Sequence, residues 1–206
     1  MRPTDLEYIV LDVETTGLSP TNGDRIVEIA AVKVRGRKII DTFDYLINPQ
    51  RLIPLEAQRI NNITDDMVSQ APSADEILPK LISFVAGASI SGHNIKFDLN
   101  FICYQLSLCG RKLNDSTPVC DTLKMARLLV PQLSSYTLGN VAQYFGLRVQ
   151  EAHRALPDVK LTASVLNRLL DMAETQGILT PDRLFKQFGV EKPVFKIIDL
   201  NQSSLF

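Results

Sequence analysis

The stretch that most constrains this chain is YIVLDVETTGL, residues 8–18. It opens as an apolar strand at 9–11 and then places Asp12 and Glu14 two positions apart, before Gly17 lets the chain turn. Side chains two apart on a strand share a face, so both carboxylates aim at one place at the carboxyl end of a buried strand. Like charges this close raise the pKa of one carboxyl unless a cation lies between them, and hard oxygen ligands favour magnesium or manganese. A solvated, idle strand end is the alternative that this stretch alone leaves open.

Composition bounds the remaining possibilities. With 206 residues, 45% of them hydrophobic, the chain is long enough for one well-buried domain with some extra length. No apolar run approaches the ~20 residues that span a bilayer, and the first residues lack the apolar core of a signal peptide. Three cysteines without C-x-x-C spacing indicate free thiols, so we expect a cytoplasmic protein.

The net charge of −1 limits how the chain can hold nucleic acid. A protein that grips long duplex DNA usually carries a basic surplus, because contacts to phosphates dominate its affinity. A nucleic-acid ligand of this chain is therefore expected to be short, or to be held with help from metal ions or a partner.

The order of elements predicts a mixed α/β domain. The opening strand is followed by two more at 25–34 and 39–47 with short turns between them, which is typical of an antiparallel meander. Helical periodicity and capping residues then alternate with short apolar strands at 88–91 and 119–120. The predicted helices lie at 56–61, 73–85, 95–108, 122–129, 138–145 and 156–172, and Thr64 is a predicted N-cap for a further turn of helix.

Two further acids are candidates for the same site. Asp98 lies near the start of a helix that Asn94 can cap, and Asp158 lies at the start of the last long helix. Each acid has a purely structural alternative, because a negative charge at a helix N-terminus gains ~0.3–1 kcal/mol from the helix dipole. The chain has only two histidines, His93 and His153, and each falls beside one of these acids. That coincidence favours a chemical role modestly.

These residues carry a family resemblance. The chain resembles the DEDDh 3′-to-5′ exonucleases, the group that contains the proofreading epsilon subunit of bacterial DNA polymerase III and ribonuclease T. Its first motif is VLDVETTGL with Asp12 and Glu14, its second is GHNIKFDLNFI with Asp98, and its third is HRALPD with His153 and Asp158 in H-x-x-x-x-D spacing. The resemblance covers about residues 5–172 and all five reactive positions are filled in order. It makes an idle carboxylate pair a poor explanation of the first motif.

Two secondary segments agree with this family. INNIT at 60–64 and CDTLKMARLL at 120–129 are similar to segments of epsilon-type and Gram-positive replicative proofreading domains. One departure is visible, since relatives often have His-Gly where this chain has Asn61 and Asn62. The family places that loop near the end of the substrate, so the departure concerns substrate detail rather than the chemistry.

The resemblance implies an RNase H-like fold, with a central five-stranded mixed sheet flanked by helices. It implies two divalent cations, Mg²⁺ or Mn²⁺, with Asp12, Glu14 and Asp158 on one ion, Asp12 bridging to the second, and Asp98 reaching that second ion through water. Two such ions ~3.5–4 Å apart stabilise the attacking and leaving oxygens of an in-line displacement. His153 is implied as the general base, for which an imidazole pKa near ~6.5 is suited at neutral pH.

Substrate contacts follow from the same motifs. Apolar contacts to the terminal base tolerate any sequence, as expected for a protein that binds single strands. Core packing is the alternative for Leu18 and Phe97, and Asp121 is expected to be a helix cap rather than a sixth ligand. The predicted substrate-binding residues are Thr15, Thr16, Gly17, Leu18, Ile63, His93, Asn94 and Phe97.

The C-terminal part lies outside the resemblance. We expect an exonuclease domain at 1–175, an extension at 176–201 with one short helix at 181–188, and a terminal peptide at 202–206. That peptide, QSSLF, is similar to the Q-x-x-L-F sequence with which bacterial replication and repair proteins dock on the sliding clamp. Gln202, Leu205 and Phe206 are its candidate contacts, although short motifs match by chance and the two apolar residues could instead pack on the domain itself.

The predicted function is metal-dependent hydrolysis of terminal phosphodiesters from the 3′ end of single-stranded or frayed DNA, releasing nucleoside 5′-monophosphates in proofreading or repair. The expected partners are a single-stranded DNA end, a separate polymerase subunit and the clamp, with no membrane. An RNA-trimming exonuclease with the same site remains an alternative, because the choice depends on how the site receives a 2′-hydroxyl. A non-catalytic clamp- or polymerase-binding module is a weaker one.

Overall fold

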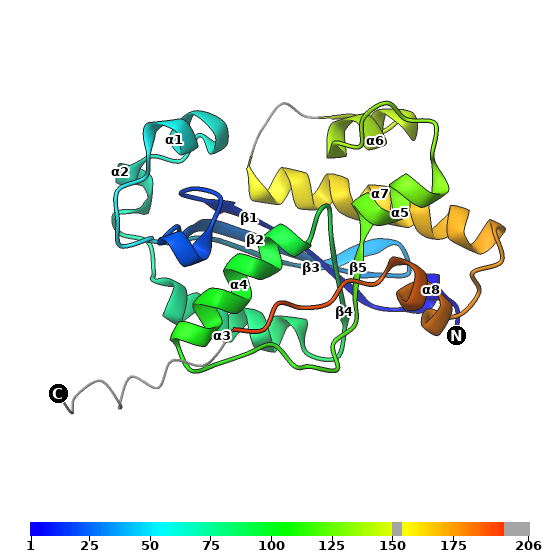
Figure 1. Ribbon diagram of the computed structural model, residues 1–206, viewed down its shortest axis with the longest axis horizontal. Coiled ribbons are helices and arrows are strands. Elements are labelled where there is room, and N and C mark those ends of the chain that lie inside the picture. The colour runs from blue at the N-terminus through cyan, green and yellow to red at the C-terminus, as the bar shows by residue number, and fades with distance from the viewer. Residues whose placement is uncertain (150–153, 196–206) are drawn as a thin grey trace.

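The fold is built on one five-stranded mixed sheet. A computed structural model of the chain describes residues 1–149 and 154–195. The strand order is β3-β2-β1-β4-β5, in which β1–β2 and β2–β3 are antiparallel and β1–β4 and β4–β5 are parallel (Figure 1). This arrangement confirms the predicted meander and mixed sheet. The strands are β1 (Tyr8–Thr15), β2 (Ile26–Arg35), β3 (Lys38–Leu46), β4 (Ser89–Gly92) and β5 (Val119–Asp121).

The helices start and end close to where the sequence predicts them. Thr64 and Asp121 each accept a hydrogen bond from a backbone N–H of the helix that follows, which confirms both as caps. Two short 3-10 helices, η1 (Pro3–Asp5) and η2 (Pro20–Asn22), flank β1. The α-helices are α1 (Leu55–Asn61), α2 (Asp65–Val68), α3 (Ala74–Val85), α4 (Lys96–Leu108), α5 (Thr122–Leu129), α6 (Leu138–Tyr144), α7 (Ala155–Thr175) and α8 (Pro181–Phe188).

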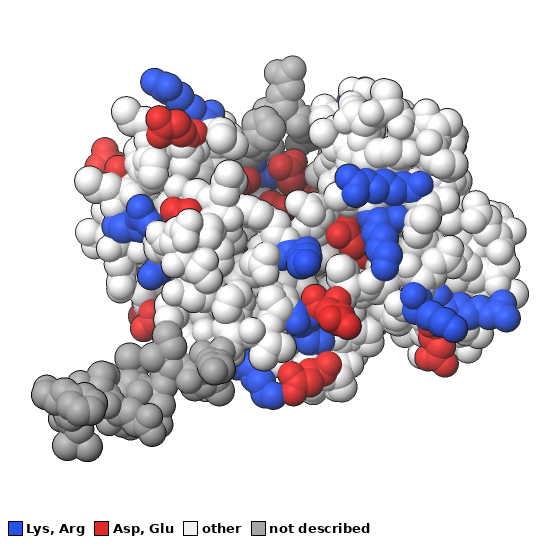
Figure 2. All heavy atoms as spheres, viewed as in Figure 1, with Lys and Arg blue, Asp and Glu red and all other residues white. Residues whose placement is uncertain are grey.

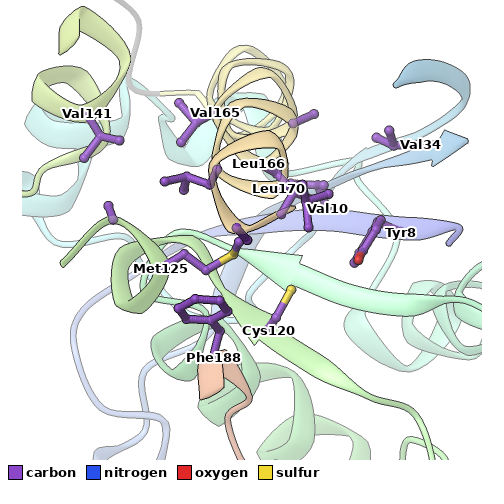
Figure 3. Close-up of a cluster of buried hydrophobic side chains, with 14 of the residues drawn as sticks. Tyr8, Val10, Val34, Cys120, Met125, Val141, Val165, Leu166, Leu170 and Phe188 are labelled. Atoms are coloured by element: carbon purple, nitrogen blue, oxygen red, sulfur yellow. The ribbon is translucent and has the colours of Figure 1, made fainter. Parts of the chain in front are cut away.

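Alternation along β1 divides the interior into two cores. Tyr8 and Val10 face a core shared with α5, α6, α7 and α8, whereas Ile9 and Leu11 face a second core shared with α3 and α4. Figure 3 shows the first core, with Leu166 and Leu170 of α7 next to Val10 of β1 and Val165 on the side of α7 toward Val141 of α6. Even-numbered residues of β1 therefore lie under α7, and this places Asp12 and Glu14 on the α7 face.

The segment after α7 packs on the same domain. Leu184 and Phe188 of α8 are completely buried in the α7-side core, and the backbone N–H of Val190 donates to Val119 O of β5 at 3.2 Å. Part of the predicted extension thus contributes to the core, while the domain boundary at residue 175 stays a prediction. Across the described ranges, no helix is both long enough and apolar enough to cross a membrane.

Candidate active site

Two carboxylates stand at the carboxyl end of β1. Asp12 and Glu14 are half-buried and follow Val10 on the face that α7 covers. In the β1–β2 register Asp12 lies opposite Ala30 and Glu14 lies opposite Glu28. Because directly opposite residues of antiparallel strands share a face, β2 adds a third carboxylate, Glu28, to this place. Figure 2 shows acidic atoms within a hollow between the α1–α2 side of the molecule and the α6 side.

Asp98 reaches the same strand end from the opposite layer. It is in the first turn of α4, is buried, and its Oδ1 accepts a hydrogen bond from the backbone N–H of Val13 at 3.0 Å. Val13 lies between Asp12 and Glu14, so this bond fixes the Asp98 carboxyl beside both. Gly92 makes the approach of this segment possible, because a Cβ there would come within 2.8 Å of Leu11 O.

Asp158 completes the set from α7. It is half-buried in the first turn of that helix, and its charge contributes to the raised pKa of both Asp12 and Glu14. Burial is the largest cause of the shift in each of the other three acids. It raises the pKa of Asp12 and Asp98 well above the usual range and that of Glu14 to about 7. The acids therefore form one electrostatically coupled group with excess negative charge.

The chemistry of this donor set fits a hard divalent cation. Carboxylate oxygens are the ligands that magnesium and manganese prefer, and a cation would offset the repulsion that raises these pKa values. Within residues 1–149 and 154–195, no three acidic, histidine or cysteine side chains already stand at the spacing of a formed metal site. Without a cation between them, the carboxylates of this group repel each other, and this repulsion explains why they stand further apart than the ligands of a formed metal site.

Sequence reasoning missed the role of Glu28 and Arg154. The Arg154 Nε donates to both carboxylate oxygens of Glu28 at 3.0 Å, and its Nη2 donates to Oε1 at 2.5 Å. Glu28 Oε2 also accepts the backbone N–H of Ala155 at 2.9 Å. One signal was available in the sequence, since Glu28 interrupts an otherwise apolar strand and a buried charge needs a partner.

The end of β1 and the loop after it contain four of the predicted substrate-binding residues, at positions 15–18. Leu18 is 84% exposed and so is not core, and the hydroxyl of Thr15 donates to Gly17 O at 2.6 Å. Thr16 is different, because it is buried, its N–H donates to Arg25 O and its hydroxyl oxygen accepts the Arg25 N–H. Thr16 thus shapes the loop, and the predicted contact of its backbone or hydroxyl group with substrate stays a prediction.

The segment after β4 requires one correction. The ring nitrogens of His93 are both engaged inside the protein, Nδ1 with Thr122 Oγ1 at 3.0 Å and Nε2 with Tyr136 O at 2.8 Å, and its place in the wall beside the substrate stays a prediction. Burial lowers the pKa of His93. Asn94 is exposed and does not cap α4, whose N-cap is Ile95. The Asn94 amide is thus left for the predicted substrate contact.

The remaining predicted contacts, Ile63 and Phe97, both pack against other side chains of the protein. Ile63 is completely buried in a small core, and the predicted contact of its side chain with a base stays a prediction. Phe97 is half-buried and packs on Phe101 with ring centroids 5.2 Å apart, which favours the core alternative for most of its surface. Asn61 supports the site instead, since its Nδ2 donates to Thr15 O at 3.4 Å. His153, the predicted general base, and the terminal residues Gln202, Leu205 and Phe206 lie outside the described residues.

Comparison with known proteins defines the class. The sequence profile of the family described as exonuclease, RNase_T, matches residues 9–166. The chain is 38% identical over 172 residues to a PolC-type DNA polymerase III of Caldanaerobacter subterraneus, covering 84% of this chain and 12% of that protein. It is 37% identical over 179 residues to a DNA polymerase III subunit epsilon-like protein of Rhodobacter capsulatus, covering 85% of this chain and 25% of that protein. The chain therefore spans only about an eighth to a quarter of the length of these relatives.

Solved structures of exonucleases have the same fold as this chain. Exonuclease X in complex with 5′ overhanging duplex DNA superposes with a TM-score of 0.68 at 28% identity, covering 86% of this chain and 96% of that one. The nuclease domain of 3′hExo, a DEDDh family member bound to rAMP, gives a TM-score of 0.74 at 19% identity, covering 94% and 100%. The chain belongs to the exonuclease family and has the RNase H-like fold, which confirms the resemblance that its motifs carry. Members of the DEDDh group depend on divalent metal ions.

Proposed function

We propose that this chain is a 3′-to-5′ exonuclease that removes nucleoside 5′-monophosphates from single-stranded or frayed DNA ends, in replication proofreading or repair. One observation carries the proposal. The acids of β1, α4 and α7 form one coupled group, in which the pKa values of Asp12, Glu14 and Asp98 are raised, at the end of the sheet where an exposed apolar residue, Leu18, also lies. The relatives that are named DNA polymerase III subunits or 3′-5′ exonucleases support the choice of DNA.

In this proposal the chain's own residues have three tasks. Asp12, Glu14 and Asp158 would hold one divalent cation, Asp12 would also serve a second, and Asp98 would reach that second cation through water. When bound, the cations supply Lewis-acid charge to the attacking and leaving oxygens at phosphorus. His153 accepts a proton from the attacking water as general base, and this assignment rests on its place in the third motif. Both Mg²⁺ and Mn²⁺ suit the carboxylate set.

Contacts to the terminal nucleotide would come from the loop after β1 and the turn after β4. The exposed side chain of Leu18 offers an apolar surface to a base regardless of its sequence. Gly17 leaves room for the Asp24 side chain within this loop, since a Cβ at position 17 would stand 2.4 Å from Asp24 Oδ2. Thr15 and the exposed amide of Asn94 add polar groups.

The test is digestion of single-stranded DNA and RNA of one sequence, labelled at the 5′ end, in the presence of magnesium or manganese. We expect a ladder that shortens from the 3′ end of DNA with wild type and with Asp41→Asn, which changes an exposed acid of β3, and no ladder with Asp12→Asn. Faster loss of RNA would move the protein to RNA trimming. DNA cleavage equal in wild type and Asp12→Asn would contradict the proposal.

We further propose that a polymerase subunit and the sliding clamp are partners, with the clamp contacted through Gln202, Leu205 and Phe206. A net charge of −1 supports the need for such help in holding DNA. Replacing Leu205 and Phe206 together by alanine should abolish binding to immobilised clamp and leave digestion of short oligonucleotides unchanged. Equal clamp binding by both proteins would contradict this contact.

A further inference from the structure

Glu28 is a buried carboxylate that the proposed chemistry does not use. Its side chain is 2% exposed, yet it carries four hydrogen bonds. Oε1 accepts from Nε and Nη2 of Arg154, and Oε2 accepts from Nε of Arg154 and from the backbone N–H of Ala155. An ionised carboxylate offers about four lone-pair sites, so this one has little capacity left for a metal ion. Glu28 therefore belongs to the acidic group by position but differs from it in bonding.

The partners of Glu28 lie where α7 begins. Arg154 occupies the N-cap position of α7 and Ala155 is its first residue. The N-cap makes no side-chain hydrogen bond to its own helix, so Glu28 takes the place of a capping side chain by accepting the Ala155 N–H. Asp158 follows in the same turn, and its backbone N–H donates to Arg154 O at 3.3 Å. The position of Asp158 is thus coupled to the ion pair through one turn of helix.

Glu28 and Glu14 stand directly opposite each other across β1 and β2. The ion pair therefore fastens the start of α7 to the strand position next to the β1 acids. Removing Arg154 would leave the buried charge of Glu28 uncompensated, and removing Glu28 would leave the Ala155 N–H without its acceptor. Either change would let the first turn of α7 shift. A planar guanidinium suits this task better than an ammonium, because it forms the two-pronged contact with a carboxylate.

We propose that Glu28 and Arg154 are positioning residues: their ion pair fixes the first turn of α7, and with it Asp158, against Asp12 and Glu14 without itself binding metal. This inference deepens the proposed function and rests on it. It predicts that the pair controls cation affinity and turnover rather than stability alone.

The experiment measures Mn²⁺ affinity by calorimetry, thermal unfolding, and kcat and KM on single-stranded DNA for Glu28→Gln and Arg154→Lys. Arg37→Gln is the matched control, since the Arg37–Asp171 ion pair also ties α7 to the sheet, but through exposed side chains further along the helix. Asp12→Asn is the reference for loss of a metal ligand. Glutamine keeps the size of Glu28. Lysine keeps the positive charge of Arg154 but cannot make the two-pronged contact of a guanidinium with a carboxylate.

We expect both site variants to remain folded, to bind Mn²⁺ about tenfold more weakly and to lose about tenfold in kcat, with KM for DNA changed by less than about twofold. Arg37→Gln should bind and turn over like wild type. The inference is overturned if both site variants lower the melting temperature but bind Mn²⁺ like wild type. It is also overturned if Glu28→Gln loses Mn²⁺ as completely as Asp12→Asn while Arg154→Lys binds normally, because Glu28 would then be a ligand.

The two proposals fail in different ways. Wild type that binds no more Mn²⁺ than Asp12→Asn would remove the proposed function and the inference with it. Normal binding and turnover by wild type, together with unchanged Glu28→Gln and Arg154→Lys, would remove the inference alone.

Discussion

Glu14 and Glu28 face each other across β1 and β2, but their surroundings differ. Glu28 is satisfied by four hydrogen bonds from Arg154 and Ala155. The pKa of Glu14 is raised to about 7, first by burial and then by the charges of Glu28 and Asp158, with Arg154 opposing the shift. The same sheet face thus holds one paired carboxylate and a group of carboxylates with excess charge.

This difference distinguishes a carboxylate with a structural role from carboxylates that could bind a ligand. A buried charge that is fully hydrogen-bonded has a structural account, whereas neighbouring carboxylates with raised pKa values cost stability and point to a ligand that restores it. The group that includes Asp12, Glu14 and Asp98 is the one we assign to cations. In our inference, the Glu28–Arg154 ion pair fixes the first turn of α7 beside this group.

The largest expected effect comes from Asp12. Asp12→Asn removes the charge that is coupled to Asp98, Glu14 and Asp158, so kcat/KM on single-stranded DNA should fall on the order of 10³-fold or more. Relief of repulsion should at the same time leave the metal-free protein as stable as wild type or more so. Steady-state kinetics and thermal melts measure the two effects. Loss of activity together with lower metal-free stability would show that Asp12 is structural, like Glu28.

The reverse pattern is expected for the paired acid. Glu28→Ala breaks a buried ion pair and should cost about 3–5 kcal/mol of unfolding free energy. Arg37→Ala breaks an exposed pair and should cost less than about 1 kcal/mol. Denaturant unfolding of metal-free protein at pH 7 gives both values. Equal losses in the two variants would mean that burial adds nothing to the Glu28 pair.

Metal-free stability should fall as pH rises, whereas the stabilisation that added metal brings should grow. Because burial first of all raises the pKa of Glu14 from its ordinary value of 4.5 to about 7 in the folded protein, the metal-free fold prefers the protonated form. Stability from this group is fully present below about pH 4.5 and is lost as pH rises through about 7, so the metal-free melting temperature should fall on the order of 5 °C between about pH 5.5 and pH 8.

Added Mn²⁺ binds the ionised carboxylates, so its stabilisation should be larger at the higher pH. Scanning calorimetry with and without Mn²⁺ at both pH values tests this, and Glu14→Gln should flatten the metal-free trend. A Mn²⁺ effect that is the same at both pH values would argue against carboxylate ligands.

The smallest effect is expected at Asp44. This exposed acid of β3 contributes to the raised pKa of Arg154, after Glu28, but makes no hydrogen bond to it within the described residues. Asp44→Asn should therefore change kcat and Mn²⁺ affinity less than about twofold, since an exposed charge is screened by solvent. A tenfold change would show that charge around Arg154 matters more than its fork of hydrogen bonds to Glu28.

Much of the fold could be predicted because local chemistry and pattern agree. Caps at Thr64 and Asp121 and the alternation of β1 fix elements that the structure confirms. The first and second motifs gave Asp12 and Asp98 because each is a charge at the end of an apolar element. Their roles as ligands stay predictions.

What sequence could not supply was long-range pairing. Glu28 and Arg154 lie 126 positions apart, and only the fold brings them together. His93 and Ile63 belong to motif segments, and the motifs did not reveal that the His93 ring is hydrogen-bonded inside the protein or that Ile63 is completely buried.

The most direct test counts bound manganese by electron paramagnetic resonance, with a DNA strand whose 3′-terminal linkage is protected from cleavage. Wild type and Glu28→Gln are compared with Asp12→Asn at saturating Mn²⁺. The account predicts two ions per chain for wild type and for Glu28→Gln, at a higher Mn²⁺ concentration in the second, and fewer for Asp12→Asn. Equal numbers of ions in wild type and Asp12→Asn would contradict the assignment of the β1 acids as the cation site.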